Sequence, residues 1–352
     1  LLDDNKVDTS QVYDSRGGEI TYYGRKVRDS HKGGYGKISL ARGFEVSSNT
    51  VLVQAVYENY KNNPKEFVDR IDRMGLNKPL GLPFQGEGKP FIPQPGEKGW
   101  SGLALPWMAY GYGVSVTPLQ TLALYNAIAN NGEMVKPIFV SEIKEWNKTI
   151  KKYNKQVINP KICSQETVKK VKAVLENVVK KGTGSKLYSQ DFSMAGKTGT
   201  AQVNYSRGKD EMYYASSFVG FFPSDKPKYS CIVVVHKPNT AKNNYYGADV
   251  AGPVFKRIAQ KIFTDAPSTN EIKNLNKKIN KQEVAYSVYN DKINSEKKVL
   301  PNLKGMAGMD AIALLENLKI KVKIIGTGKV KKQSIQPGEA LENIKTITLE
   351  LS

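Results

Sequence analysis

Three strand-like runs in close succession constrain the fold of this chain more than any other feature. They cover residues 195–202, 214–222 and 229–236, and short loops connect them. Strands joined in this way pair antiparallel, because a parallel pair needs a crossover of a dozen or more residues. Amphipathic helical patterns over 166–181 and 250–263 flank them, the second with Val254, Phe255, Ile258 and Ile262 on the face expected to be buried. The sequence therefore predicts an α+β fold with helices packed on an antiparallel sheet.

The first of these runs contains a compact polar motif, Lys197-Thr198-Gly199-Thr200. On an edge strand, this order presents an ammonium and a hydroxyl to a cleft. The glycine leaves the main chain bare, so that a substrate can lie alongside it. An ordinary strand end with a turn explains the same letters, because the tripeptide alone is a weak signal.

A second polar segment, Ser47-Ser48-Asn49, lies at a junction between expected helices. Apolar spacing predicts one helix over 38–46, the next over 51–60, and a third over 64–74. Ser and Asn are preferred at helix N-termini, so capping alone also accounts for the segment. Further along, Pro118 after Thr117 predicts a helix over 119–129.

The charge balance limits the classes of partner. The 352 residues include 53 Lys and Arg against 33 Asp and Glu, a formal net charge of +20. Such an excess favours anionic neighbours, such as nucleic acid, lipid headgroups or wall polymers, unless the lysines only cover solvated faces. No basic cluster is interleaved with aromatic residues as a nucleic-acid platform requires, so no nucleic-acid partner is predicted.

Cysteine and histidine usage excludes further classes. Cys163 and Cys231 are far apart, and His31 and His236 have no partner at metal-site spacing. A metal site or a disulfide framework is therefore not expected, and no motif calls for a cofactor. No run of about eighteen apolar residues is present, so no membrane span is predicted.

The composition divides the chain into three parts. Residues 266–298 are rich in Lys and Asn with little apolar content, which is typical of a linker. Residues 299–352 read as a small domain, with a helix near 310–318 and strands at 321–325, 330–335 and 346–351. The larger domain then covers 1–265, and its opening residues, Leu1 to Asp4, resemble the tail of a helix.

Taken in order, these motifs resemble those of class B penicillin-binding proteins. Besides the segments at Ser47 and Lys197, the stretches 111–120 (GYGVSVTPLQ) and 217–223 (SFVGFFP) are similar to family sequences, and 299–352 resembles a PASTA domain. The resemblance implies the penicillin-binding transpeptidase fold, an antiparallel sheet flanked by helices plus an all-helical lobe. A one-helix, three-strand PASTA domain follows it.

The resemblance also implies a role for each motif residue. It assigns catalytic roles to Ser47, Asn49, Lys197 and Thr200, and substrate binding to Thr198 and Gly199. In this scheme Ser47 relays a proton and Asn49 binds the substrate amide. The ammonium of Lys197 attracts the anionic substrate, the hydroxyl of Thr198 binds its terminal carboxylate, and the N–H of Thr200 contributes to an oxyanion hole.

The family's nucleophile, the serine of a Ser-x-x-Lys motif, has no counterpart at the expected place. Two such tetrapeptides begin at Ser141 and Ser295, but both follow Ser47, the first in an expected strand and the second in the linker. We reject both, so this chain supplies no nucleophile. The expectation is a domain that lacks its N-terminal part, including the serine and a membrane anchor, and is inactive alone.

The whole protein is then expected to be a peptidoglycan D,D-transpeptidase. It would cross-link stem peptides that end in D-Ala-D-Ala through a serine acyl-enzyme, and β-lactams would inhibit it. The implied partners are division or elongation membrane proteins, and the implied location is the outer face of the cytoplasmic membrane or the periplasm. Two alternatives stay open: a serine β-lactamase-like hydrolase, and a non-catalytic wall-binding or division scaffold.

Overall fold

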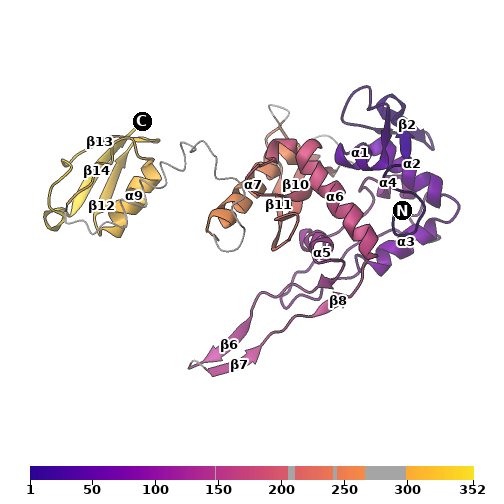
Figure 1. Cartoon of the computed structure of the whole chain (residues 1–352), viewed down its shortest axis with the longest axis horizontal. Coiled ribbons are helices and arrows are strands. Elements are labelled where there is room, and N and C mark those ends of the chain that lie inside the picture. Colours follow the sequence, from indigo (N-terminus) through magenta and orange to yellow (C-terminus); the bar gives the residue numbers. More distant parts are fainter. Residues whose placement is uncertain (147, 205–210, 241–243, 266–298) are drawn as a thin grey trace. The chain divides into compact units, whose positions relative to one another are not determined.

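The chain forms two compact units, Leu1–Ser268 and Thr269–Ser352 (Figure 1). The computed structural model describes residues 1–146, 148–204, 211–240, 244–265 and 299–352. The expected linker, 266–298, therefore lies outside the described residues.

The described elements of unit 1 alternate between helices and short strands. Its helices are α1 (Leu40–Glu45), α2 (Asn49–Tyr60), α3 (Pro64–Arg73), α4 (Ala104–Met108), α5 (Pro118–Ala129), α6 (Gln165–Lys181) and α7 (Gly247–Asp265), with 3-10 turns η1 (Arg16–Gly18) and η2 (Ser185–Leu187). Its strands are β1 (Val12–Asp14), β2 (Glu19–Tyr22), β3 (Arg25–Arg28), β4 (Lys37–Ser39), β5 (Met134–Val135), β6 (Glu142–Glu145), β7 (Lys148–Lys152), β8 (Val157–Asn159), β9 (Ala195–Val203), β10 (Tyr213–Phe222) and β11 (Tyr229–His236).

The main sheet is the antiparallel one that the sequence predicts. Its order is β11-β10-β9, which places β9 at an edge. The β9–β10 register is continuous from Ala195 to Val203 and pairs Lys197 with Val219. On one face, α7 buries Phe255 against Phe218 of β10. On the other, helix α6 packs against β9. The strand that carries the lysine motif is thus held from two sides.

The buried stripe of α7 differs from the expected one. The large apolar residues Val254 and Ile258 were expected to face the core, but their side chains are 42% and 37% exposed. Phe255 is fully buried as expected, together with Ala251 and Ala259. Small residues let the helix approach the sheet closely, so the alanines and not the larger residues set its orientation.

A helical lobe built from α1 to α4 packs beside the sheet region. Tyr13, Leu40, Val51 and Ala55 form one of its cores. The helix expected over 38–46 begins only at Leu40, because Ile38 pairs with Tyr13 between β4 and β1. Helix α4 was not predicted, since it is a five-residue helix within a Gly- and Pro-rich stretch.

Two further local expectations, at Thr117 and at the first residues of the chain, are confirmed. The helix expected after Thr117 is confirmed as α5, and Thr117 forms a capping box with Gln120. The expected helical tail at Leu1 to Asp4 is confirmed by its hydrogen bonds. The Asn5 N–H donates to the Leu2 carbonyl and the Lys6 N–H to the Leu1 carbonyl, both at 3.1 Å, and Asn5 has φ of 52°, which together form the Schellman pattern of a helix C-terminus.

Unit 2 has the expected helix and three strands. Helix α9 (Gly308–Asn317) precedes β12 (Lys321–Ile325), β13 (Val330–Gln333), the 3-10 turn η3 (Leu341–Asn343) and β14 (Thr346–Leu351). The sheet order is β12-β14-β13, with β12 and β14 parallel and β13 and β14 antiparallel. Its core gathers the buried side chains of Leu300, Leu303, Leu314, Leu315, Ile347 and Leu349.

Candidate active site

The two polar motifs meet at the junction between α1 and α2. Helix α1 ends in a Schellman motif: the Ser48 N–H donates to the Gly43 carbonyl (2.8 Å) and the Ser47 N–H to that of Phe44 (3.1 Å). Ser47 occupies the left-handed position of this motif, with φ of 56°. Glycine is usual there, because an L-residue in this region costs roughly 1–2 kcal/mol. A serine is thus held in a disfavoured conformation, which is common at functional sites.

Asp29 fixes the start of α2. Its carboxylate accepts three hydrogen bonds, each 2.9 Å long, from the Ser48 hydroxyl and from the N–H and hydroxyl of Thr50. Ser48 and Thr50 are both fully buried. Ser48 is also the N-cap of α2 and accepts from the Val51 N–H. Ser47 is therefore held by the end of one helix and by the anchored start of the next.

The end of α6 ties this junction to the sheet. The Thr183 N–H donates to the Glu45 carbonyl at 3.0 Å. The Thr183 hydroxyl lies 2.9 Å from that of Thr198 in β9. Arg42 adds a second tie by donating to the Lys181 carbonyl at 2.9 Å. These contacts hold α1 against β9, and they bring Ser47 next to the lysine motif.

Lys197 and Ser47 are in direct contact. The Lys197 ammonium donates to the Ser47 hydroxyl and to the Thr198 carbonyl, the latter at 3.2 Å. It also lies 5.5 Å from the centre of the Phe44 ring. Burial lowers the pKa of Lys197 from its ordinary value to about 8, because an apolar environment disfavours the charged form. An ammonium and a hydroxyl separated by 150 residues thus share one half-buried place.

The outer edge of β9 presents main-chain groups at this place. In an antiparallel strand, the N–H and C=O of one residue point to the same side, and the side alternates along the strand. The Gln202 N–H donates to the Tyr112 hydroxyl at 3.2 Å, so residue 202 points away from β10. The register is uninterrupted, so the N–H of Thr200 points to the same open edge. The Thr198 carbonyl, which accepts from Lys197, points there as well.

Gly199 and the side chain of Thr200 contact α7. The Gly247 N–H donates to the Thr200 hydroxyl at 3.0 Å. A Cβ at Gly247 would lie 2.5 Å from the Gly199 carbonyl oxygen, and a Cβ at Gly199 would lie 2.5 Å from the Ser217 hydroxyl. Gly247 therefore lets the start of α7 approach β9 closely, and Gly199 leaves room for the Ser217 side chain of β10. The substrate-binding role of Gly199 stays a prediction.

Asn49, the first residue of α2, is oriented by a single strong contact. Its side-chain N–H donates to the Arg28 carbonyl at 2.7 Å. That bond leaves the amide oxygen as the group that can accept a hydrogen bond from a ligand N–H.

Asp29, Thr183 and Tyr112 are the site residues that sequence reasoning missed. Tyr112 lies in the stretch 111–120, which attracted attention only as a family sequence. Thr183 follows the glycine that ends α6, and Asp29 follows β3. At neither position does the local sequence indicate which distant residue the side chain contacts. Both act through contacts across the fold.

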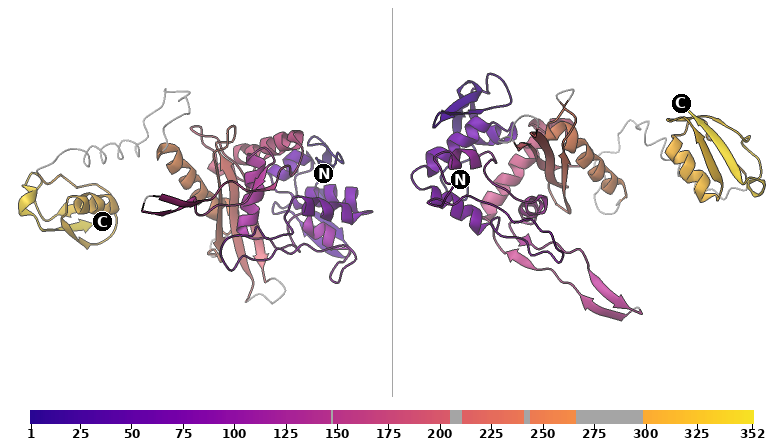
Figure 2. Two further views of the ribbon diagram at one scale, coloured as in Figure 1. Left: turned by 90° about the horizontal axis from the view of Figure 1, so that it is seen from below. Right: turned by 180° about the vertical axis from the view of Figure 1, so that it is seen from behind.

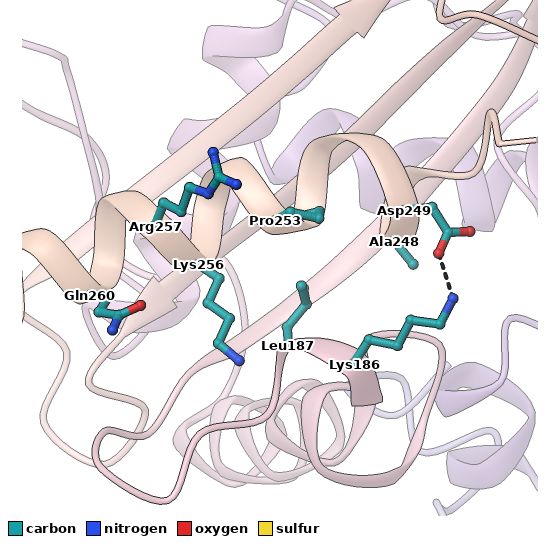
Figure 3. A pocket seen from close by; sticks show the side chains of 8 residues that line it. All are labelled: Lys186, Leu187, Ala248, Asp249, Pro253, Lys256, Arg257 and Gln260. Atoms are coloured by element: carbon teal, nitrogen blue, oxygen red, sulfur yellow. Dashed lines mark hydrogen bonds and ion pairs between the residues drawn. The ribbon is translucent and has the colours of Figure 1, made fainter. Parts of the chain in front are cut away.

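A hollow of about 290 Å³ lies apart from Ser47 and Lys197, beside η2 and the start of α7 (Figure 3). It is lined by Lys186, Leu187, Ala248, Asp249, Pro253, Lys256, Arg257 and Gln260. Lys186 is paired with Asp249 at 2.7 Å. Arg257 points to the opposite side of α7 from Lys256 in Figure 3. Because these cations do not converge, we assign no ligand to this hollow.

Neither a metal site nor a membrane span has a candidate among the described residues. In that part of the chain, no three His, Cys, Asp or Glu side chains are grouped so that they could hold a metal ion. No described helix is both long and apolar enough to cross a bilayer.

The chain belongs to the penicillin-binding protein transpeptidase family. The model of the penicillin-binding protein transpeptidase domain matches residues 1–260, and that of the PASTA domain matches residues 298–352. The two together, with the relatives described next, identify a class B penicillin-binding protein with a C-terminal PASTA domain, as the sequence motifs predicted.

Relatives with curated names support this assignment. Stage V sporulation protein D of Bacillus subtilis is 30% identical over all of this chain and 52% of its own length. Peptidoglycan D,D-transpeptidase FtsI of Buchnera aphidicola (strain Bp) is 34% identical over 56% of this chain and 33% of its own length. The chain thus spans at most about half the length of these relatives.

Solved structures show the same fold. The transpeptidase domain of penicillin-binding protein 3 from Burkholderia pseudomallei is 26% identical, with a TM-score of 0.63, over 76% of this chain and 77% of that one. Penicillin-binding protein 2X from Streptococcus thermophilus gives a TM-score of 0.59 at 21% identity, over 100% of this chain and 59% of that one. The expected penicillin-binding transpeptidase fold is confirmed.

Proposed function

We propose that this domain cross-links peptidoglycan stem peptides that end in D-Ala-D-Ala, through a serine acyl-enzyme that β-lactams also form. The observation that carries the proposal is the contact between the Lys197 ammonium and the Ser47 hydroxyl, beside the open edge of β9. A cation, a hydroxyl and outward main-chain donors are what an acyl-transfer site needs around a substrate carbonyl.

The proposed chemistry has two steps. The serine of a Ser-x-x-Lys segment attacks the penultimate D-Ala carbonyl and expels the terminal D-Ala as its amine. A neighbouring stem's amine then attacks the acyl-enzyme, so that the cross-link forms and the serine is released. Ser47 relays a proton to the leaving amine, a role supported by its contact with Lys197, which can orient the hydroxyl.

The remaining roles follow from the groups that face the β9 edge. The Thr200 N–H is one oxyanion-hole donor, and its outward direction in the strand supports this role. Lys197 and the Thr198 hydroxyl attract and bind the terminal carboxylate. The amide oxygen of Asn49 accepts a hydrogen bond from a substrate N–H, which its bond to Arg28 supports.

We place the attacking serine in a Ser-x-x-Lys segment outside these 352 residues. Ser141, which begins one such tetrapeptide, is exposed and precedes β6, whereas Ser47 and Lys197 meet at the α1–α2 junction. Ser295, which begins the other, lies outside the described residues. We further propose an outer location on the cytoplasmic membrane, with division or elongation membrane proteins as partners.

Labelling with a fluorescent penicillin, followed by a denaturing gel, tests this proposal. The 352-residue chain should give no labelled band, and a longer form that carries the Ser-x-x-Lys segment should give one. A labelled band from the 352-residue chain that disappears in Ser141→Ala would overturn the assignment. Rapid turnover of a chromogenic cephalosporin by the longer form would instead favour a β-lactamase-like hydrolase.

A further inference from the structure

Strands β6 and β7 form a ribbon that leaves the body of unit 1 (Figures 1 and 2). They pair only with each other, as a separate two-stranded sheet. Every residue of β7 is exposed, and so are three of the four residues of β6. An isolated two-stranded hairpin is marginally stable in water. The side chains of this hairpin therefore contribute little to folding, and their chemistry calls for another explanation.

The tip of the hairpin carries a large unshielded aromatic residue. Trp146 is 96% exposed and lies at the turn, with φ of 48°. Two further apolar side chains on the ribbon, Ile143 and Ile150, are 44% and 59% exposed. Such an apolar group on a projecting element is unusual for a surface that faces only water.

The second strand carries most of the positive charge. Lys148, Lys151 and Lys152 form no ion pair within the described part of the chain. The acidic Glu142 is already engaged, by Lys144 at 2.7 Å and by the Thr149 hydroxyl at 3.0 Å. Residues 142–152 hold four lysines against two glutamates, so the hairpin combines an exposed indole with a net charge of +2.

The pairing register shows how these groups are arranged. Ile143 lies opposite Lys151, and Glu145 lies opposite Lys148, so that apolar, cationic and acidic side chains are mixed along the ribbon. Lysines along a sheet edge deter the addition of another strand. The lysines of β7 therefore argue against a partner that extends this small sheet.

We propose that the hairpin tip docks on an anionic lipid surface. Tryptophan prefers the boundary between headgroups and acyl chains, and nearby lysines are attracted to anionic headgroups. Trp146 enters that boundary, while Lys148, Lys151 and Lys152 remain at the level of the phosphates. The contact is interfacial and not spanning. It is independent of the proposed transpeptidase chemistry, because the site at Ser47 and Lys197 contributes nothing to it.

Vesicle sedimentation with the 352-residue chain tests the proposal. The vesicles are phosphatidylcholine with or without about one-third phosphatidylglycerol. We expect binding only to the anionic vesicles, and a loss of about tenfold or more in Lys148→Gln/Lys151→Gln/Lys152→Gln. Trp146→Ser should bind several-fold more weakly. The circular dichroism spectrum of each variant checks that the fold is kept.

A chain with a net charge of +20 binds anionic surfaces without a specific site, so the control removes equal charge elsewhere. The matched triple is Lys329→Gln/Lys331→Gln/Lys332→Gln in unit 2, where all three lysines are exposed. We expect it to lose less than about twofold. Equal losses from the two triples, no effect of Trp146→Ser, or no binding by the unaltered chain would each overturn the proposal.

Discussion

Removing the carboxylate of Asp29 should destabilise unit 1 and release Ser47. In Asp29→Ala, the Thr50 N–H loses its acceptor. The Ser48 and Thr50 hydroxyls lie 3.1 Å apart, so one of them can donate to the other, and only one hydroxyl is left without an acceptor. Each buried donor left without a partner costs about 1–3 kcal/mol. Asp29 is itself half-buried, so water can enter in part. We therefore expect a loss of about 2–4 kcal/mol in the free energy of unfolding.

Two variants make this estimate specific. Asp29→Asn keeps an oxygen that accepts from the Thr50 N–H, and its amide N–H can donate to the nearby hydroxyls. This variant should therefore lose only about 1 kcal/mol in the free energy of unfolding. Asp69→Ala is the matched control. Its carboxylate is 43% exposed and pairs with Lys65 one turn away. Such pairs contribute about 0.3–0.5 kcal/mol.

Urea unfolding followed by tryptophan fluorescence measures these differences within one unit. Trp100, Trp107 and Trp146 all belong to unit 1, so unit 2 is silent in this assay. Equal free energies of unfolding for Asp29→Ala and Asp69→Ala would refute the role assigned to the Asp29 carboxylate.

Three further predictions concern the same site. Ser47→Gly should be more stable than Ser47→Ala by about 1 kcal/mol in urea unfolding, because only glycine tolerates the left-handed backbone at this position without cost; equal stabilities would contradict the Schellman assignment. The pKa of Lys197 lies near 8 in the folded protein and near 10.5 in the unfolded chain. Between these values the unfolded state binds more protons than the folded state, so the contribution of Lys197 to the free energy of unfolding should rise with pH from about 8 to 10.5. Urea unfolding at pH 7.5 and 9.5 measures this rise, and Lys197→Met should lack it. Tyr112→Phe removes the acceptor of the Gln202 N–H, so hydrogen exchange of that amide should accelerate roughly fivefold or more. Exchange of the Lys197 amide, which points to β10, should not change. An unchanged rate at Gln202 would show that the Tyr112 hydroxyl does not bond the strand edge.

The strands of the main sheet and of unit 2, and most helices, could be predicted from sequence because their signals are local. The three runs of the main sheet and the capping box at Thr117 need only neighbouring residues to be recognised. Where the prediction failed, packing decided the outcome. The orientation of α7 depends on how closely Ala251 and Ala259 approach the sheet, and a pattern of large apolar residues does not contain that information.

The site was predictable as two polar motifs, but not as one place. Ser47 and Lys197 are far apart in the sequence, and Thr183 holds them together in the fold because it contacts both Glu45 in α1 and Thr198 in β9. The left-handed backbone of Ser47 could not be predicted either, because a glycine is the usual sequence signal of a Schellman motif and this position has a serine. The hydrogen bonds that Asp29 accepts likewise come from Ser48 and Thr50, which are 19 and 21 positions away in the sequence.

The rate of acylation by a fluorescent penicillin tests the central claim most directly. The protein to use is a longer form that includes the proposed Ser-x-x-Lys segment. If Lys197 and Ser47 complete the site, Lys197→Ala and Ser47→Ala should each slow labelling by about 100-fold or more, whereas the exposed Lys186→Ala should label normally. Labelling of Lys197→Ala at the unaltered rate, in a protein that still unfolds cooperatively, would contradict the account.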